Sequence, residues 1–245
     1  DFVDFFGDPF YRNILWVTLR VSLVSTAISL VLGYPTAFYM ARTKSRMKQV
    51  MMIVILFPFL VSAVVRSYGW MVILGTNGLL NQLLQKLGII ALYNHLTGSN
   101  LEYFTMIDTQ GAVVLGMVYN YLPFMILPIY SVICKLDYSL LEAARDLGAN
   151  TVTVFRKVIL PLSLPGVLSG ITMVFVPSVS TFAISRMLGG GTELLLGDLI
   201  ERQFLGGAYN PQLGAAISLV MMLIVVVCML VMNRFGEGEE QAVML

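Results

Sequence analysis

Long apolar blocks dominate the pattern of hydrophobic and polar positions along the chain. Five of them are long enough to cross roughly 30 Å of hydrocarbon at 1.5 Å per residue, and they cover residues 13–41, 49–65, 111–134, 162–183 and 213–232. The pattern predicts an all-α integral membrane protein with at least five transmembrane helices. The chain begins at Asp1 without a methionine, so this count is a minimum. Residues 1–234 are then the transmembrane domain and residues 235–245 a cytoplasmic tail.

Two shorter segments have helical periodicity without spanning length. In residues 77–88, Asn77 can cap the start of a helix and Gly88 its end, and the apolar face carries Leu79, Leu80, Leu83, Leu84 and Leu87. In residues 193–205 the apolar side carries Leu196, Leu199, Ile200 and Phe204. Both segments are predicted to be helices in the outer membrane interface. Each serves either as a lid on the bundle or as a surface for a soluble partner.

Cationic residues flank the blocks asymmetrically. Four follow the first block, at positions 42, 44, 46 and 48, and four follow the third, at positions 135, 145, 156 and 157. The positive-inside rule places both loops in the cytoplasm. An odd number of spans then puts Asp1 outside and the tail that begins at Asn233 inside.

Small residues and prolines mark the blocks themselves. In the first block, small side chains recur at helical spacing and are expected to let another helix approach closely; they are Ser22, Thr26, Ser29 and Gly33. Each proline removes a backbone donor and favours a kink, although proline is in any case commoner in membrane helices than in soluble ones. These prolines are Pro35, Pro58, Pro123, Pro128, Pro165 and Pro177.

Composition narrows the function classes. Hydrophobic residues make up 58% of the chain and charged residues 12%, against roughly 25% charged residues in soluble domains. The net charge of +1 and the lack of an extended basic patch argue against nucleic acid as a partner. Cys134, Cys228 and His95 have no neighbours suited to a metal site. Without a Ser–His pair, metal site or paired carboxylates at membrane level, we expect a non-catalytic subunit with no cofactor of its own.

The predicted spans are almost free of charge. They contain no Asp or Glu, and Arg20 is their single basic residue. Carriers driven by ion gradients generally need an intramembrane ionisable group to bind the coupling ion. An ion-coupled carrier is therefore disfavoured, although sodium coupling through backbone carbonyls stays open. The driving force is expected to enter from the cytoplasmic side.

The longest cytoplasmic loop, residues 135–161, contains two short helices with capping signals. Either Asp137 or Ser139 can cap the first helix, and Gly148 suits its left-handed end. The second starts at Asn150 or Thr151. The loop is predicted to be a short, stiff protrusion joined directly to the fourth span.

The same loop carries a spaced motif. Glu-Ala-Ala is followed after three residues by Gly, and after nine more by an aliphatic residue, any residue, Leu and Pro; the positions are Glu142, Ala143, Ala144, Gly148, Val158, Leu160 and Pro161. Pro161 is also expected to end the second helix at the membrane surface. With Val158 in place of isoleucine, the motif resembles that of permease subunits of binding-protein-dependent ABC importers, the type I family. The resemblance implies the type I permease fold and a coupling helix that docks on a nucleotide-binding subunit.

Physical chemistry agrees with a docking role for the helix pair. The residues implied to couple to the ATPase are Glu142, Ala143, Ala144, Arg145, Asp146 and Gly148. The alanines keep the surface low, so that a partner can approach, and Glu142 offers a carboxylate to a partner cation. Alternatively, Glu142 pairs with Arg145 on the same helix, a surface contact worth less than about 1 kcal/mol.

Further stretches, at residues 31–35, 57–59, 66–69, 121–125 and 141–149, resemble the B-type permease subunits of spermidine/putrescine importers. The resemblance implies polyamine import by alternating access across a bacterial plasma membrane. It also implies three partners: a C-type permease, an ATPase dimer that binds ATP and Mg, and an extracytoplasmic substrate-binding protein.

A polycation crossing this bundle needs carboxylates or aromatic faces. The candidate substrate contacts of this chain are Trp70, Tyr119, Tyr121, Phe175, Phe182, Asp198 and Glu201. The aromatic residues can instead be interfacial anchors, and the partner permease can supply the carboxylates.

Three other functions stay open at this point. The same machine can carry another small solute, such as an amino acid or an anion. An ion-coupled carrier or channel predicts flux without an ATPase. A purely structural membrane scaffold predicts that changes at Glu142 or Gly148 leave uptake intact.

Overall fold

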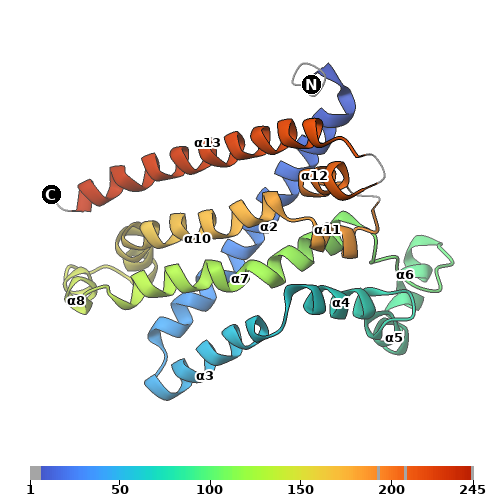
Figure 1. Cartoon of the computed structure of the whole chain (residues 1–245). Helices are drawn as coiled ribbons and strands as arrows, with labels where there is room; N and C mark the ends of the chain where they lie inside the picture. Colours follow the sequence, from blue (N-terminus) through green and yellow to red (C-terminus); the bar gives the residue numbers. More distant parts are fainter. Residues whose placement is uncertain (1–6, 192–193, 207–208, 244–245) are drawn as a thin grey trace. The chain divides into compact units, whose positions relative to one another are not determined.

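The computed structural model describes residues 7–191, 194–206 and 209–243, and within those ranges it contains helices and no strand. The longest helices are α2 (Pro9–Arg42), α7 (Gln110–Cys134), α10 (Leu160–Ser180) and α13 (Pro211–Val243), labelled in Figure 1. Four segments are long and apolar enough to span a membrane, or five if one broken helix pair counts as a span. The predicted all-α membrane protein is confirmed. Asp1, Glu193 and the last two residues of the predicted tail lie outside the described residues.

The second apolar block, residues 49–65, is the broken pair and not the continuous helix that the sequence predicts. α3 (Ser45–Leu56) is followed by a 3-10 turn, η1 (Phe57–Leu60), and then by α4 (Ala63–Leu74). Pro58 in the turn has no N–H to donate. Ser62, the residue before α4, has an extended backbone with φ −52° and ψ 141°. The apolar composition correctly indicated a membrane segment. Pro58 and Ser62, however, interrupt the helix within it.

The fourth block is continuous with the loop before it. α8 (Tyr138–Asp146) comes first, and then α9 (Thr151–Val154), the π-helical segment η2 (Phe155–Ile159) and α10 follow one another without a gap. Pro161 therefore lies in the first turn of α10, and the expectation that it ends a helix is wrong. The wider π winding just before it changes the hydrogen-bond register, so that the missing N–H and the ring of Pro161 are accommodated.

Short helices complete the described chain: α5 (Leu79–Lys86), α6 (Ile89–Thr97), α11 (Ala183–Leu188) and α12 (Leu196–Leu205). α10 stops at Ser180, three residues before the predicted end of its block, because Phe182 leaves the helical region with φ −129°. Gly88 follows α5 in the left-handed conformation, with φ 70°, as predicted. Asn77 does not cap α5, since the capping position is Gly78.

Two compact units divide the chain, and each has its own core. Unit 1 comprises residues 1–25, 58–120 and 178–221, and unit 2 comprises residues 26–57, 121–177 and 222–245. In unit 1, Gly116 of α7 leaves room for Ile184 and Leu188 of α11, whose side chains a Cβ at this position would overlap. The core of unit 2 is formed by Ala37, Met40, Met125, Ile126, Ile129, Ile133, Val167 and Val174.

The small-residue face of the first block is buried, as a close helix contact requires. Ser22, Thr26 and Ser29 are all buried on α2. Within unit 2, a Cβ added at Gly33 would lie 2.9 Å from Cγ of Met125 on α7. The predicted close approach is therefore confirmed at Gly33. The missing side chain lets α2 and α7 pack together in unit 2.

Candidate functional site

The first helix of the cytoplasmic loop, α8, is capped at both ends by neighbouring residues of the loop. The backbone N–H of Ser139 donates to Oδ1 of Asp137 at 2.9 Å, so Asp137 and not Ser139 is the cap. This hydrogen bond lowers the pKa of the Asp137 carboxyl. At the other end Gly148 has φ 82°, and the N–H of Ala149 donates to the carbonyl of Ala144 at 3.1 Å. The predicted left-handed terminus is confirmed.

The second helix begins at the other predicted cap. Oδ1 of Asn150 accepts a hydrogen bond from the N–H of Thr153 at 2.8 Å. Asn150, and not Thr151, is therefore the capping residue. Asp137 and Asn150 thus cap the starts of the two helices, and Gly148 forms the corner between them. α9, η2 and α10 are continuous, so the loop connects directly to a candidate span.

The motif residues of the helix pair face outward. Glu142, Ala143, Arg145, Asp146 and Gly148 are exposed, and Ala144 is half-buried. In the part of the chain that the structure describes, Glu142 forms no ion pair with Arg145. The carboxylate is therefore free to meet a cation of a partner, which is one of the two interpretations that the sequence leaves open.

Apolar side chains next to the motif are also exposed, and sequence reasoning missed them. Leu147 is 89% exposed, and Leu140 and Val152 are exposed as well. These side chains are available for contact with a partner that docks on the helix pair. The available signal was the presence of leucine directly before the corner glycine, where a solvated turn favours polar residues.

Aromatic residues hold the helix pair against α2 within unit 2. The ring of Phe155 packs edge-on against Tyr34 and Phe38, with centroid distances of 5.8 Å and 5.6 Å. The Tyr34 hydroxyl shares a 2.7 Å hydrogen bond with the Ser163 hydroxyl of α10. Below them, Leu141, Val154 and Ile159 form a small buried cluster. The helix pair thus packs against α2 through Phe155, and α2 is joined to α10 by the Tyr34–Ser163 hydrogen bond.

The sequence contained a signal for this anchor. Tyr34 and Phe38 are four residues apart, so they lie on one face of the predicted first helix. Their partner Phe155 lies in the cytoplasmic loop, far along the chain, and periodicity cannot identify such a long-range contact.

The predicted substrate contacts are divided between the two units. In unit 1, Trp70 and Tyr119 form an edge-to-face pair with a centroid distance of 5.3 Å, and Phe182 is exposed. In unit 2, the Tyr121 hydroxyl donates to the carbonyl of Pro177 at 3.5 Å, and Phe175 is buried. Trp70 with Tyr119 is the one pair of candidates, among the described residues, that forms a ring contact.

The two candidate acids already have intramolecular partners. Asp198 is 4% exposed, and its Oδ2 accepts from the Ser185 hydroxyl at 2.6 Å and from the Leu195 N–H at 3.0 Å. Glu201 is paired with Arg186 at 2.6 Å. Burial raises the pKa of Asp198, and its hydrogen bonds offset only part of this effect. The carboxylate joins the start of α12 to α11.

Titration of Asp198 is expected to make the protein less stable as pH rises. The folded pKa lies above the unfolded one, so between them the native state holds a proton that the unfolded chain has released, and the free energy of unfolding falls. Asp198→Asn keeps an acceptor for the Leu195 N–H and carries no charge, so its stability should stay flat over this interval. Thermal unfolding of the purified protein in detergent, from about pH 2 upward, measures the difference and also covers the lower interval in which Asp137 titrates.

Asp137→Asn is the control of opposite sign. The pKa of Asp137 is lowered in the fold, so its contribution is present above the unfolded pKa and is lost as pH falls through the folded pKa. A wild-type stability that rose with pH relative to Asp198→Asn would contradict the assignment for Asp198.

Comparison with known proteins places this geometry in context. A family model described as "Binding-protein-dependent transport system inner membrane component" matches residues 29–239. The spermidine/putrescine transport system permease protein PotB of Haemophilus influenzae is 38% identical over 230 residues, which are 94% of this chain and 77% of that protein. The protein of the same name from Escherichia coli K12 is 37% identical over 227 residues, 93% of this chain and 78% of that one.

A solved structure shares the fold at much lower identity. A chain of a bacterial ABC transporter that imports the acidic polysaccharide alginate superposes with a TM-score of 0.78 at 16% identity, over 96% of this chain and 82% of that one. The agreement confirms the predicted importer permease fold.

Proposed function

Because the chain belongs to the family of binding-protein-dependent transport system inner membrane components, we propose that it is the B-type permease subunit of a spermidine and putrescine importer. The observation that carries this proposal is the identity of more than a third of the residues, along nearly the whole chain, with two PotB permeases. The chain itself is a non-catalytic, multi-pass subunit of the inner membrane, and its helices contribute to the translocation path.

The proposed machine has three further components. A C-type permease pairs with this chain, an ATPase dimer binds ATP and Mg on the cytoplasmic side, and an extracytoplasmic binding protein delivers the polyamine. The nearly uncharged spans support this arrangement, because they contain no acid that binds a coupling ion.

The helix pair is the proposed contact with the ATPase. Glu142, Ala143, Ala144, Arg145, Asp146 and Gly148 form the docking surface, and the exposed Leu140 and Leu147 extend it. The small alanine side chains allow a groove of the partner to approach the helix closely. The charged groups fix the register of the contact, and the apolar side chains add contact area.

Closure of the ATPase dimer would move the helix pair as a unit. Its anchors, Phe155 on Phe38 and the Tyr34–Ser163 hydrogen bond, pass the movement to α2 and α10. Tilting of these helices would open the path to alternate sides of the membrane.

Trp70 and Tyr119 are the proposed aromatic contacts of the polyamine in this chain. Their edge-to-face pair offers ring faces that attract an ammonium group. Tyr121, Phe175 and Phe182 stay candidates from the sequence alone. The carboxylates that a polycation needs are expected mainly from the partner permease.

The test is reconstitution of the chain with its presumed partners in liposomes. Labelled spermidine should accumulate inside only when ATP, the ATPase and the loaded binding protein are present, and unlabelled putrescine should compete while amino acids do not. Import of another solute with the same ATP dependence would overturn the substrate assignment alone. Uptake without the ATPase would overturn the importer assignment and support an ion-coupled carrier or channel.

A further inference from the structure

Two neighbouring hollows lie in unit 2 at the cytoplasmic end of α2. The first has a volume of about 320 Å³ and the second about 250 Å³. Phe38, Arg42 and Ile159 line both hollows, so the two are adjacent. The proposed function uses Phe38 and Phe155 as an anchor and Arg145 for docking, but it assigns no occupant to either hollow.

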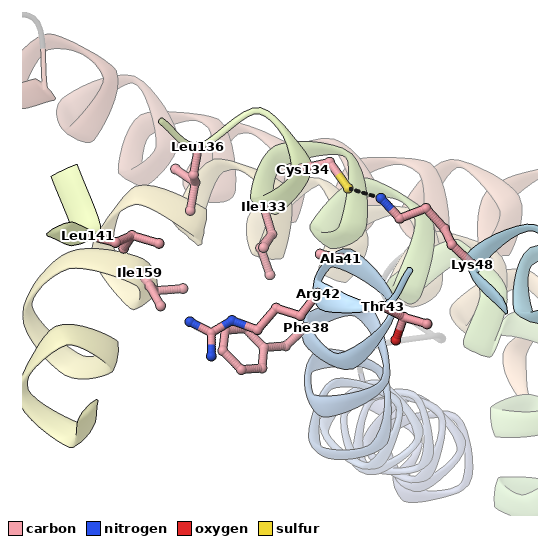
Figure 2. A pocket seen from close by; sticks show the side chains of 10 residues that line it. All are labelled: Phe38, Ala41, Arg42, Thr43, Lys48, Ile133, Cys134, Leu136, Leu141 and Ile159. Carbon is pink, nitrogen blue, oxygen red and sulfur yellow. Dashed lines mark hydrogen bonds between the residues drawn. The ribbon is translucent and has the colours of Figure 1, made fainter. Parts of the chain in front are cut away.

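The first hollow is polar and basic on one side. Arg42, Thr43 and Lys48 line it, while Ile133 and Leu136 give it an apolar side (Figure 2). Figure 2 shows the Arg42 side chain reaching from the end of α2 toward Ile159, and the Lys48 ammonium directed at Cys134. No acidic residue is among the described residues that line either hollow. The electrostatic field in this space therefore favours an anion.

Both cations have only weak partners. The Arg42 guanidinium lies over the ring of Phe38, 4.5 Å from its centroid, and this contact leaves the in-plane N–H donors available. Lys48 Nζ lies 3.7 Å from Sγ of Cys134, a poor acceptor, and 5.5 Å from the centroid of Tyr130. Neither cation forms an ion pair in the part of the chain that the structure describes. A phosphate oxygen would be a much stronger acceptor for both.

The second hollow is lined mainly by apolar side chains. Val152, Val154 and Phe155 contribute its walls, and Arg145 reaches its edge. An apolar groove that continues from a basic hollow fits a molecule with an anionic head and a hydrocarbon chain. Its place at the level of the positive cytoplasmic loop is where headgroups of the inner leaflet lie.

We propose that the two hollows bind an anionic phospholipid of the cytoplasmic leaflet, with its phosphate on the basic side of the first hollow, in the field of Arg42 and Lys48, and the start of an acyl chain against Val152 and Phe155. The bound lipid would contact Leu141 and Ile159, the buried base of the helix pair. Binding itself is independent of which solute the protein carries.

The test measures lipid retention by native mass spectrometry. The protein, with whatever subunits copurify, is placed in nanodiscs of phosphatidylcholine mixed with an equal amount of phosphatidylglycerol and then released from them. Wild type should retain phosphatidylglycerol in preference to phosphatidylcholine. Arg42→Gln and Lys48→Gln should each weaken this retention about fivefold, the effect of one cation near an anionic surface, and Arg42→Lys should largely restore it.

Arg46→Gln is the matched control, since Arg46 belongs to the same loop, is exposed and lines neither hollow. Equal loss of lipid from this variant would show that retention depends on the overall positive charge of the loop. That result would overturn the proposed site. Val152→Trp, which fills the apolar hollow, should also weaken retention. Displacement of the lipid by inorganic phosphate alone would show that the site takes free phosphate, and it would overturn the lipid assignment.

Discussion

Gly148→Trp is expected to abolish nearly all ATP-driven uptake while leaving the protein in the membrane. Gly148 has φ 82°, a conformation that costs a side-chain-bearing residue about 1–2 kcal/mol. A Cβ there meets no atom within 4 Å, so the indole would project from the proposed docking surface. The substitution thus strains the corner and blocks the partner. Uptake and ATP hydrolysis in proteoliposomes, with the amount of protein measured in the same vesicles, give the result.

Alanine separates backbone strain from bulk at the same position. Gly148→Ala adds the strain without the large side chain and should lower uptake only in part. Gly88→Ala is its matched control, because Gly88 has φ 70°, also meets nothing within 4 Å, and lies outside the helix pair. Uptake that stayed at the wild-type level in Gly148→Trp would reject the coupling assignment and favour a structural scaffold.

Phe155→Ala is expected to uncouple ATP hydrolysis from uptake. The change removes both ring contacts of the anchor, to Tyr34 and to Phe38. For a half-buried ring this lowers the stability of the attachment by about 2 kcal/mol, which corresponds to a shift of about 30-fold in its equilibrium. The ATPase can still dock on the intact surface of α8, so hydrolysis should continue while uptake falls. The ratio of solute imported to ATP hydrolysed is the quantity to measure.

Phe155→Leu is the control for this experiment, because leucine keeps most of the volume without the ring geometry. It should retain an intermediate ratio. A second control, Tyr209→Ala, removes an exposed ring of unit 1 that belongs to no anchor and to no candidate substrate contact. An unchanged ratio in Phe155→Ala would mean that the aromatic contacts do not carry the movement of the helix pair.

Local signals predicted much of this fold. The apolar blocks located the long helices because burial in lipid needs continuous runs of apolar residues. Asp137, Gly148 and Asn150 marked the ends of the two cytoplasmic helices, since capping depends on a few neighbouring atoms. Where two residues competed as the cap, the pattern left both open and the geometry separated them.

The errors came from effects that extend beyond a few neighbours. Pro161 predicts the end of a helix when only its neighbours are considered. The π winding before it nevertheless lets the helix continue. The sequence carried no signal that the Asp198 carboxylate is buried where it meets the Ser185 hydroxyl. The partner of Phe155 lies more than a hundred residues away in the sequence. Such contacts depend on tertiary structure, which composition and periodicity do not contain.

The π-helical segment Phe155–Ile159 contains one residue more than α winding would use at the end of the cytoplasmic loop. If this turn tightened to ordinary α winding, everything before it would rotate by about 100° around the helix axis, the angle of a single residue. The direction in which Glu142 points is therefore set by the hydrogen-bond register of one turn. Re-aiming the protrusion would break the contacts of Phe155 with Tyr34 and Phe38, but it would need no sliding of α10 through the bilayer.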